Sequence, residues 1–199
     1  TSKSIIVGSS YGISTYWISP AIPDFIKRNP EISITIKVSL SDFDLEALDL
    51  CISTKIPDRP DLIQKKIRKS TFKLYANKTY LEQFGYPKSP KDLNSHRLIF
   101  LAGDDYILLH EPESLFQIDN EGKFRKPKIV VNSAAAEMLL VKKGAGIACL
   151  SNDWEDLNDP NIVDIFPEQE KIVDIYATYN PNNKNSLIEP FIEHLSRNL

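Results

Sequence analysis

Apolar and polar residues in the first quarter of the chain follow two different periods. Residues 5–7 form a short apolar run that stops at a Gly-Ser-Ser sequence, which indicates a buried strand leading into a loop. Five apolar residues between 17 and 26 recur at helical spacing, and Pro30 ends that predicted helix. Apolar and polar residues then alternate over 32–38, and a further short apolar strand is expected at 49–52. Strand, helix and strand in this order favour a largely parallel sheet with helices on its faces.

The rest of the chain repeats this alternation of short strands and helices. Strands are predicted at 72–76, 98–101, 128–131, 147–150 and 172–179. Helices are expected at 78–84, at 134–143 and from a Ser-x-x-Glu capping box at 186–189 onward. Gly85 closes the first of these helices, and Gly144 is placed as the left-handed cap of the second. Residues 103–122 are interpreted as a hairpin or as irregular structure.

The charge of the chain gives it no general affinity for nucleic acid. Its 24 Lys and Arg against 27 Asp and Glu give a net charge of −3, whereas duplex binding draws on a local surplus of cations. The densest basic run, residues 65–69, is interpreted as a solvated strand or turn, with a nucleic-acid patch as the weaker alternative. No apolar run reaches the ~18 residues of a membrane span, and residues 1–4 lead into a strand without a visible signal peptide.

The motifs of common enzyme classes are missing from the sequence. There is no GxSxG, Walker, HExxH or GxGxxG sequence. Cys51 and Cys149 lie in apolar runs and are expected to be small buried hydrophobic residues. His96, His110 and His194 are scattered, and His194 is expected on the exposed polar side of the last helix. We therefore expect no metal, no cofactor and no enzymatic activity.

Polar residues at the ends of predicted strands suit ligand binding better than catalysis. Four strands end in hydroxyl or amide residues, namely Ser9-Ser10, Ser39 with Ser41, Ser53-Thr54, and Asn132-Ser133. In open α/β sheets, ligands bind at the carboxyl ends of strands, and helix N-termini there favour anionic or carbonyl groups. Each of these residues could simply cap a helix, but four such ends together predict a shared polar cleft.

Four segments, in this order and spacing, resemble the effector-binding domains of LysR-type transcriptional regulators. They are the Trp-Ile-x-Pro to Asn-Pro-x-Ile segment at 17–32, Asp-Leu-Cys-Ile at 49–52, Tyr-Leu to Asp-Leu-x-x-His at 80–96, and Val-Asn-Ser to Gly-x-Gly-Ile-Ala at 131–148. The likeness runs from about residue 5 to residue 195. The short segment at 42–50, together with Trp17, is similar to the subgroup of the glycine-cleavage activator and the β-lactamase regulator.

The resemblance implies a fold like that of type 2 periplasmic binding proteins, with two Rossmann-like α/β subdomains joined by two crossover strands. Subdomain I would comprise 1–73 and 175–199, and subdomain II would comprise 74–174. The crossovers would lie near 72–77 and 172–176, so that the last helix returns to subdomain I. A winged helix-turn-helix DNA-binding domain, which such regulators carry at the N-terminus, is absent from this chain.

The resemblance also implies a small-molecule effector, of unidentified nature, in the cleft between the subdomains. Carried over position by position, the candidate contacts are Ser9, Ser10, Tyr11, Asp42, Ser53, Thr54, Leu101, Ala102, Asn132, Ser133 and Tyr179. Ser53 or Thr54 stands where many members carry Arg, which weakens the transfer of carboxylate recognition, and Ser151-Asn152 replaces a common Leu-Pro.

The implied function is effector sensing and oligomerisation for a cytoplasmic transcriptional regulator. Its partners would be a second copy of the chain (a tetramer in the full-length protein) and DNA, the latter only through the missing N-terminal domain. The helix near Phe25 would pack against the helix at 134–143 of the second copy. An exported solute-binding protein with the same fold is the alternative, and an enzyme on the same scaffold is a more remote one.

Overall fold

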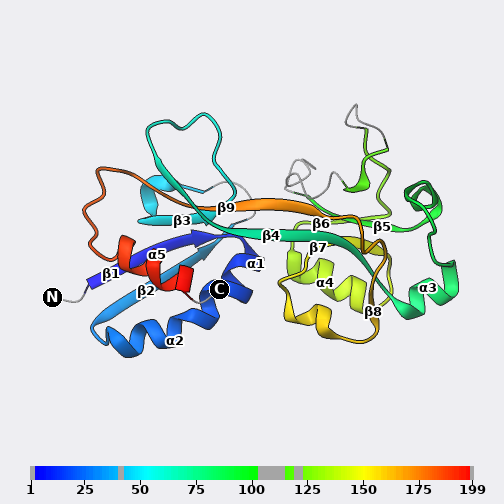
Figure 1. Ribbon diagram of the computed structural model, residues 1–199, viewed down its shortest axis with the longest axis horizontal. Helices are drawn as coiled ribbons and strands as arrows, with labels where there is room; N and C mark the ends of the chain where they lie inside the picture. Colours follow the sequence, from blue (N-terminus) through cyan, green and yellow to red (C-terminus); the bar gives the residue numbers. More distant parts are fainter. Residues whose placement is uncertain (1–2, 40–42, 103–114, 119–122, 198–199) are drawn as a thin grey trace. The chain divides into compact units, whose positions relative to one another are not determined.

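The computed structural model describes residues 3–39, 43–102, 115–118 and 123–197. The chain forms two compact units, unit 1 made of Thr1–Lys69 with Asp174–Leu199, and unit 2 made of Ser70–Val173. It passes from one unit to the other within two long strands, β4 (Ile63–Asn77) and β9 (Lys171–Tyr179), as Figure 1 shows. The expected α/β fold of two subdomains with two crossover strands is therefore confirmed. The expected domain limits stay predictions, because compactness alone does not show which residues fold or move together.

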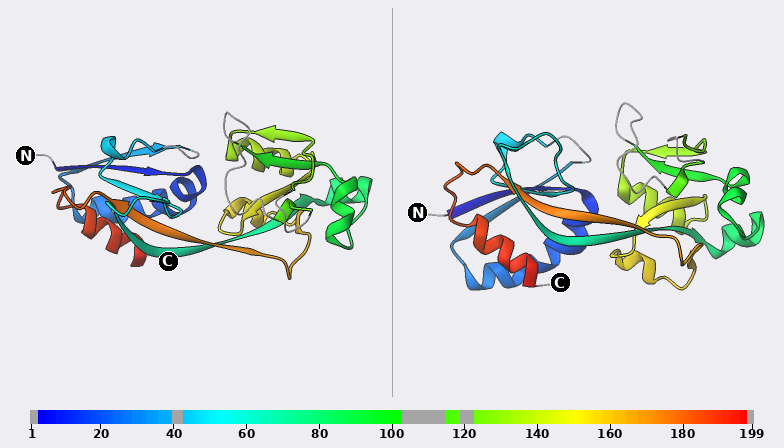
Figure 2. Two further views of the ribbon diagram at one scale, coloured as in Figure 1. Left: turned by 90° about the horizontal axis from the view of Figure 1, so that it is seen from above. Right: turned by 45° about the horizontal axis from the view of Figure 1, so that its top comes forward.

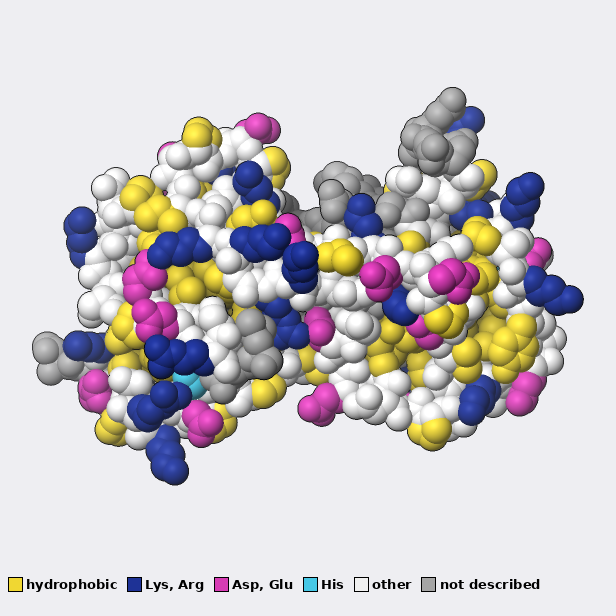
Figure 3. Space-filling model, viewed as in Figure 1, with side chains coloured by type: hydrophobic (Ala, Val, Ile, Leu, Met, Phe, Trp, Pro, Cys, Tyr) yellow, Lys and Arg dark blue, Asp and Glu magenta, His cyan; other side chains and the backbone are white. Residues whose placement is uncertain are grey.

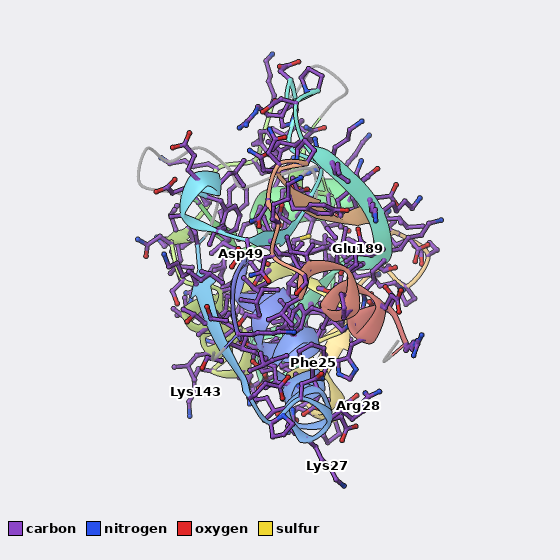
Figure 4. The ribbon with its side chains drawn as sticks, turned by 90° about the vertical axis from the view of Figure 1, so that its left-hand side faces the viewer. Phe25, Lys27, Arg28, Asp49, Lys143 and Glu189 are labelled. Carbon is purple, nitrogen blue, oxygen red and sulfur yellow. The ribbon has the colours of Figure 1, made fainter. Side chains whose placement is uncertain are left out.

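Unit 1 contains a sheet of three parallel strands and one antiparallel strand. β1 (Lys3–Ser9) lies between β2 (Ile32–Val38) and β3 (Leu50–Ser53), and both of these pairs are parallel. β9 pairs with β3 in the antiparallel sense. The ladder between β1 and β3 starts at Val7 and Leu50. Just before it, the carboxylate of Asp49, labelled in Figure 4, accepts the N–H of Ile6 at 2.8 Å and so adds a link between the two strands.

Two helices of unit 1, α2 (Ser19–Arg28) and α5 (Ile188–Arg197), pack side by side (Figures 1 and 4). Phe25 of α2 and Phe191 of α5 meet edge to face, with ring centroids 5.0 Å apart. Both rings are buried, so this contact joins α2 and α5, from opposite ends of the chain, in one core. The last helix thus belongs to unit 1, as expected.

The first helical segment begins earlier than its apolar spacing predicts. It starts with α1 (Tyr11–Ile13), continues through a π-helical turn at Ser14–Ile18 and runs directly into α2. The wide turn carries the buried Trp17, whose Nε1 donates to the carbonyl oxygen of Leu195 at 3.3 Å. The π-helical turn thus occurs where the indole ring of Trp17 packs against another part of unit 1.

His194 on α5 is buried, so the prediction of an exposed histidine was wrong. Its side chain is 5% exposed, with Nε2 2.7 Å from the carbonyl oxygen of Ala21 and Nδ1 2.8 Å from the guanidinium of Arg28. A carbonyl only accepts and a guanidinium only donates, so Nε2 carries the proton and Nδ1 accepts. The neighbouring helix α2 supplies both partners, which the periodicity of α5 alone does not reveal.

Unit 2 contains a sheet in which β4 pairs with β7 (Ile147–Ser151) in the antiparallel sense. β5 (Leu98–Leu101) is parallel both to β7 and to β6 (Ile129–Val131). A short strand that the sequence did not predict, β8 (Ile162–Asp164), pairs with the far part of β4. In the order of the described strands β6 is the last, so among the described residues it is an edge strand.

Helices cover both faces of the sheet in unit 2. α4 (Ala134–Lys142) packs on β5, β6 and β7, and the views of Figure 2 show it against these strands. α3 (Lys78–Phe84) and a 3₁₀ helix (Pro90–Ser95) contribute to a separate buried cluster that includes Leu98 and Phe100 of β5. Because alternate residues of a strand point to opposite faces, this cluster lies on the face opposite α4.

Shorter features complete the two units. Two 3₁₀ turns, Leu45–Ala47 and Glu155–Asn158, connect strands. Gly144 has φ +73 directly after α4 and its cap, as its left-handed role requires. Cys51 and Cys149 are buried free thiols, as predicted. No helix in the described part of the chain is long and apolar enough to cross a membrane.

The basic run at 65–69 lies in the first half of β4, which starts nine residues before the strand predicted there. Lys65 and Lys66 pair with carboxylates at 2.5 and 3.0 Å, and the guanidinium of Arg68 lies 5.0 Å from the centroid of the Trp17 ring. Figure 3 accordingly shows Lys and Arg interspersed with Asp and Glu on this face. The run is a solvated strand in which two of the four charges are paired with carboxylates.

Candidate functional site

The carboxyl ends of the parallel strands in unit 1 bring Ser9 and Ser53 to one edge of the sheet. In the β1–β3 ladder Ser9 is opposite Ile52, the residue before Ser53, and in the β1–β2 ladder it is opposite Val38. Thr54 follows Ser53 and is partly exposed. The edge thus collects small polar groups where ligands of open α/β sheets bind.

Ser9 carries a buried hydroxyl that has no hydrogen-bond partner among the described residues. Its side chain is 0% exposed, although its backbone oxygen accepts the N–H of Ser39 at 3.1 Å. Leaving a buried hydroxyl without a partner costs about 1–3 kcal/mol. Such groups are uncommon in native proteins and call for an explanation such as a functional role.

Ser10 and Tyr11 start the first helical segment immediately after Ser9. Ser10 has the extended backbone of an N-cap, and its oxygen accepts the N–H of Ser14 at 2.9 Å, but its hydroxyl makes no capping hydrogen bond. The helical segment continues without interruption to Arg28. The first N–H groups of such a segment lack partners within the helix and carry a partial positive charge, which favours an acceptor group of a ligand.

Phe43 and Leu48, which precede β3, pack over β1. A Cβ atom on Gly8 would stand 2.4 Å from Leu48 Cδ1 and 3.1 Å from Phe43 Cδ1, so only glycine fits without a shift. Phe43 and Leu48 therefore cover the face of β1 to which residue 8 points, which is the face opposite the side chain of Ser9. The candidate Asp42, next to Phe43, and Ser41 lie outside the described residues.

Ser53 is engaged within the protein. Its Oγ donates to the carbonyl oxygen of Thr54 at 2.9 Å, and the thiol of Cys51 lies 3.5 Å from the same Oγ. Burial raises the pKa of the Cys51 thiol to about 11. The thiol is thus a neutral structural group at this edge, and Ser53 offers a ligand only the remaining acceptor capacity of its hydroxyl.

The carboxyl ends of the parallel strands in unit 2 also collect candidate residues. Leu101 is opposite Val131 in the β5–β6 ladder, and the N–H of Ala102 donates to the oxygen of Val131 at 2.9 Å. The following Asn132 and Ser133 are exposed, and Ser133 caps α4 by accepting the N–H of Ala136 at 3.3 Å. The sequence-predicted residues of each unit therefore gather at a strand edge of their own unit.

A buried polar cluster at the end of β7 was missed at the sequence level. Ser70 Oγ and Ser151 Oγ are 2.8 Å apart, and each donates to Asp153 Oδ2, at 2.8 and 3.1 Å. Both serines are almost fully buried. Ser70 begins unit 2 on β4, so the cluster ties the crossover strand to the carboxyl end of β7.

Tyr179 is placed apart from the other candidates of unit 1. Along β9 it is three residues beyond Tyr176, which is opposite Ser53. Its hydroxyl donates to Glu189, and Lys65 lies over its ring and pairs with the same carboxylate. The hydrogen bond from Lys65 lowers the pKa of Glu189, and partial burial raises the pKa of Tyr179. The geometry does not bring Tyr179 together with Ser9 and Ser53.

The chemistry of these edges is that of hydrogen-bond recognition. Among the described residues, no group of three or more His, Cys, Asp or Glu is arranged to hold a metal ion. His96 contacts the core of unit 2, because its Nδ1 lies 3.0 Å from the hydroxyl of the buried Tyr80, and burial lowers the pKa of His96. Hydroxyl, amide and backbone groups at the strand ends can bind a small polar molecule.

A sequence model of the LysR substrate-binding domain matches residues 1–199. The chain belongs to the LysR substrate-binding domain family. An uncharacterized HTH-type transcriptional regulator of Haemophilus influenzae is 26% identical over 176 residues, which cover 85% of this chain and 59% of the relative. The HTH-type transcriptional activator TtdR of Escherichia coli is 25% identical over 186 residues, covering 88% of this chain and 57% of TtdR. This LysR domain therefore spans less than two thirds of either relative.

Solved structures show the same fold. The regulatory domain of CrgA, a LysR-type transcriptional regulator from Neisseria meningitidis, has a TM-score of 0.81 at 21% identity, with 99% of this chain and 98% of that chain covered. The effector domain of the transcriptional regulator AmpR of Pseudomonas aeruginosa has a TM-score of 0.76 at 18% identity, with 98% and 96% covered. This LysR domain thus has the type 2 periplasmic-binding-protein-like fold of LysR regulatory domains. The narrower subgroup stays a prediction.

Proposed function

We propose that this LysR substrate-binding domain senses a small-molecule effector on behalf of a DNA-binding transcriptional regulator. The observation that carries the proposal is the match of the family over all 199 residues, together with relatives that are transcriptional regulators roughly 1.7 times as long as the matched part. The additional length of those relatives would hold the DNA-binding domain, which places the complete protein in the cytoplasm with its DNA.

The effector contacts unit 1 through Ser9, Ser10 and the start of the helix at Tyr11. The buried, unpartnered Oγ of Ser9 supports this, because a ligand that supplies a hydrogen bond there removes a desolvation cost. Ser133 and Asn132 contribute from unit 2. A ligand that contacts both units with unequal affinity for two arrangements shifts the population of those arrangements.

The domain also forms a homodimer. Exposed apolar side chains on its helices support this part of the proposal: Ile26 of α2 is 39% exposed and Leu139 of α4 is 55% exposed. Packing α2 of one copy against α4 of a second would cover both side chains at once. Such an interface is isologous, so a change in the arrangement of the units is transmitted to the partner.

The native gene tests the regulator function directly. Reading the roughly 100 codons upstream of Thr1 should reveal a helix-turn-helix pattern followed by a long linker helix. A signal peptide at that place would instead identify an exported solute-binding protein and end the regulator proposal.

The effector site is tested with variants in the complete regulator, using a promoter reporter. Ser9→Ala removes the unpartnered hydroxyl, and Ser133→Ala is compared with Ser133→Asn, which keeps a helix cap. We expect Ser9→Ala and Ser133→Ala to lose the response to the native inducing condition while the fold survives. A normal response in both variants would exclude the strand ends at Ser9 and Ser133 as the effector site.

A further inference from the structure

A pocket of about 340 Å³ lies wholly within unit 2, on the face of the sheet opposite α4. Its lining is apolar except for two adjacent cations, and consists of Phe100, Ala102, Phe124, Arg125, Lys126, Pro127 and Val130. The volume is at the lower end of the range of roughly 300–1,000 Å³ found for small-molecule sites, which are also mostly apolar with a few polar groups. The described lining carries positive charge and no carboxylate.

Arg125 in this pocket is a buried cation without a paired anion among the described residues. It is 6% exposed, and its guanidinium donates to Asn94 Oδ1 at 2.7 Å and to the backbone oxygens of Gln117 and Pro90 at 2.6 and 2.9 Å. All three acceptors are neutral, and burial lowers the pKa of Arg125. A guanidinium has five N–H donors, so among the described residues two remain beyond these three bonds.

The electrostatics of this arrangement favour an anion. Taking a charge out of water is costly unless a counter-charge or sufficient hydrogen bonds compensate it. The three neutral acceptors hold the guanidinium of Arg125 in place, and no carboxylate among the described residues balances its charge. A carboxylate that accepts the remaining N–H groups would supply the counter-charge, and Lys126 beside it would add to the attraction.

The remaining walls fit an apolar body. Phe100 is stacked on Phe116, with ring centroids 4.8 Å apart and an interplanar angle of 16°, so its position is fixed. Val130 is opposite Phe100 in the β5–β6 ladder and is 38% exposed on the edge strand. Val130 thus forms an exposed part of the lining, whereas Phe100 is 2% exposed and forms its inner, aromatic part.

We propose that this pocket binds a small organic anion, a carboxylate with an apolar body of about the size of one ring. Its carboxylate accepts hydrogen bonds from Arg125 and lies near Lys126, and its body contacts Phe100 and Val130. The site is independent of the effector contacts proposed at Ser9 and Ser133, because apart from Ala102 no lining residue is among those candidates.

Phenylacetate and its neutral isostere phenylacetamide test the charge requirement, with binding to the 199-residue chain measured by isothermal titration calorimetry. We expect saturable binding of phenylacetate, and at least tenfold weaker binding of phenylacetamide, since a charge-assisted hydrogen bond is lost. Equal affinity for the two, or no saturable binding of phenylacetate, would overturn the proposal.

Variants locate the bound anion. Val130→Trp fills the pocket from the edge strand and should abolish binding, whereas Val38→Trp makes the same change on an exposed edge-strand valine of unit 1 and should not. Lys126→Gln should weaken binding severalfold, and Lys128→Gln, two residues along the same segment, should leave it unchanged.

Arg125→Lys keeps the charge but loses the planar set of donors, and should weaken binding at least tenfold. Because Arg125 also holds three neutral oxygens in place, unfolding of that variant is checked by circular dichroism. If Arg125→Lys is unfolded, the result for Val130→Trp decides whether the pocket binds phenylacetate. Phenylacetate that binds equally well to the wild type, Val130→Trp and Lys126→Gln occupies another site, and the proposal is then wrong.

Discussion

Gly146 directly precedes β7, and replacing it with alanine tests how closely two strands of unit 2 approach. A Cβ atom there would stand 2.4 Å from the carbonyl oxygen of Arg97 and 3.1 Å from its carbonyl carbon. The same oxygen accepts the N–H of Ile147 at 2.9 Å, where the β5–β7 ladder begins. Both opposing atoms belong to the backbone, so no change of rotamer relieves the overlap and the strands themselves must move apart.

The cost of Gly146→Ala follows from three contributions. Overpacking in a well-packed region costs about 1–3 kcal/mol, and weakening the hydrogen bond from Ile147 to Arg97 adds about 1 kcal/mol. The smaller backbone entropy of alanine in the unfolded chain offsets about 0.4–1 kcal/mol. We expect the free energy of unfolding to fall by about 2–3 kcal/mol, with the loss arising in unit 2.

Gly8→Ala is the matched control, because it places the same methyl group in a strand against different atoms. Its nearest contacts are Cδ1 of Leu48 and Cδ1 of Phe43, which are ends of flexible side chains, so the loss should be about 1 kcal/mol or less. Guanidinium unfolding followed by circular dichroism and tryptophan fluorescence measures both variants, with unchanged m-values as the condition for comparison. The reasoning is refuted if Gly146→Ala costs less than about 1 kcal/mol or no more than Gly8→Ala.

Three further changes have defined outcomes. Ser9→Ala should leave the free energy of unfolding unchanged or raise it by up to about 1 kcal/mol, since it removes a buried hydroxyl without a partner, and a clear loss in the same denaturation would contradict this. With its pKa raised to about 11, the Cys51 thiol should react with a disulfide reagent at pH 8 only when the protein unfolds; rapid native labelling at Cys51, located by mass spectrometry, would show that its burial is not maintained. Ile26→Asp or Leu139→Asp should shift the sedimentation mass of the chain from dimer toward monomer, and an unchanged dimer would exclude the α2–α4 interface.

Local signals in the sequence predicted most strands but failed where tertiary contacts decide. β2 has a plain alternation of apolar and polar residues and occurs where it was expected. The first half of β4 lacks this signal because it is rich in lysine and arginine, and two of its lysines pair with carboxylates of β9 and α5. The residues at 11–16 are mostly poor helix formers, so the early start of the first helical segment also depends on packing.

The beginning of α5 shows a competition between two local signals. The sequence predicts a capping box from Ser186 to Glu189, but α5 begins at Ile188, and Asn185 Oδ1 accepts the N–H of Leu187 at 3.1 Å. The carboxylate of Glu189 instead pairs with Lys65 of β4. An ion pair between residues 124 positions apart thus takes up a side chain that a purely local rule assigns to the helix end.

Predicting which residues lie at the ends of strands needs less information than predicting which polar groups meet in the core. Placing Ser9 and Ser133 at a sheet edge requires only that each follows a strand and precedes a helix, which the sequence contains locally. The pair formed by Ser70 and Ser151 requires the register of two strands whose residues are 81 positions apart. Ser151 caps the following turn, because its Oγ accepts the N–H of Asp153 at 3.3 Å. The same oxygen contacts Ser70 on β4, so a residue with a local role also has a second role that only the tertiary structure supplies. This second role links the carboxyl end of β7 to the strand by which the chain enters unit 2.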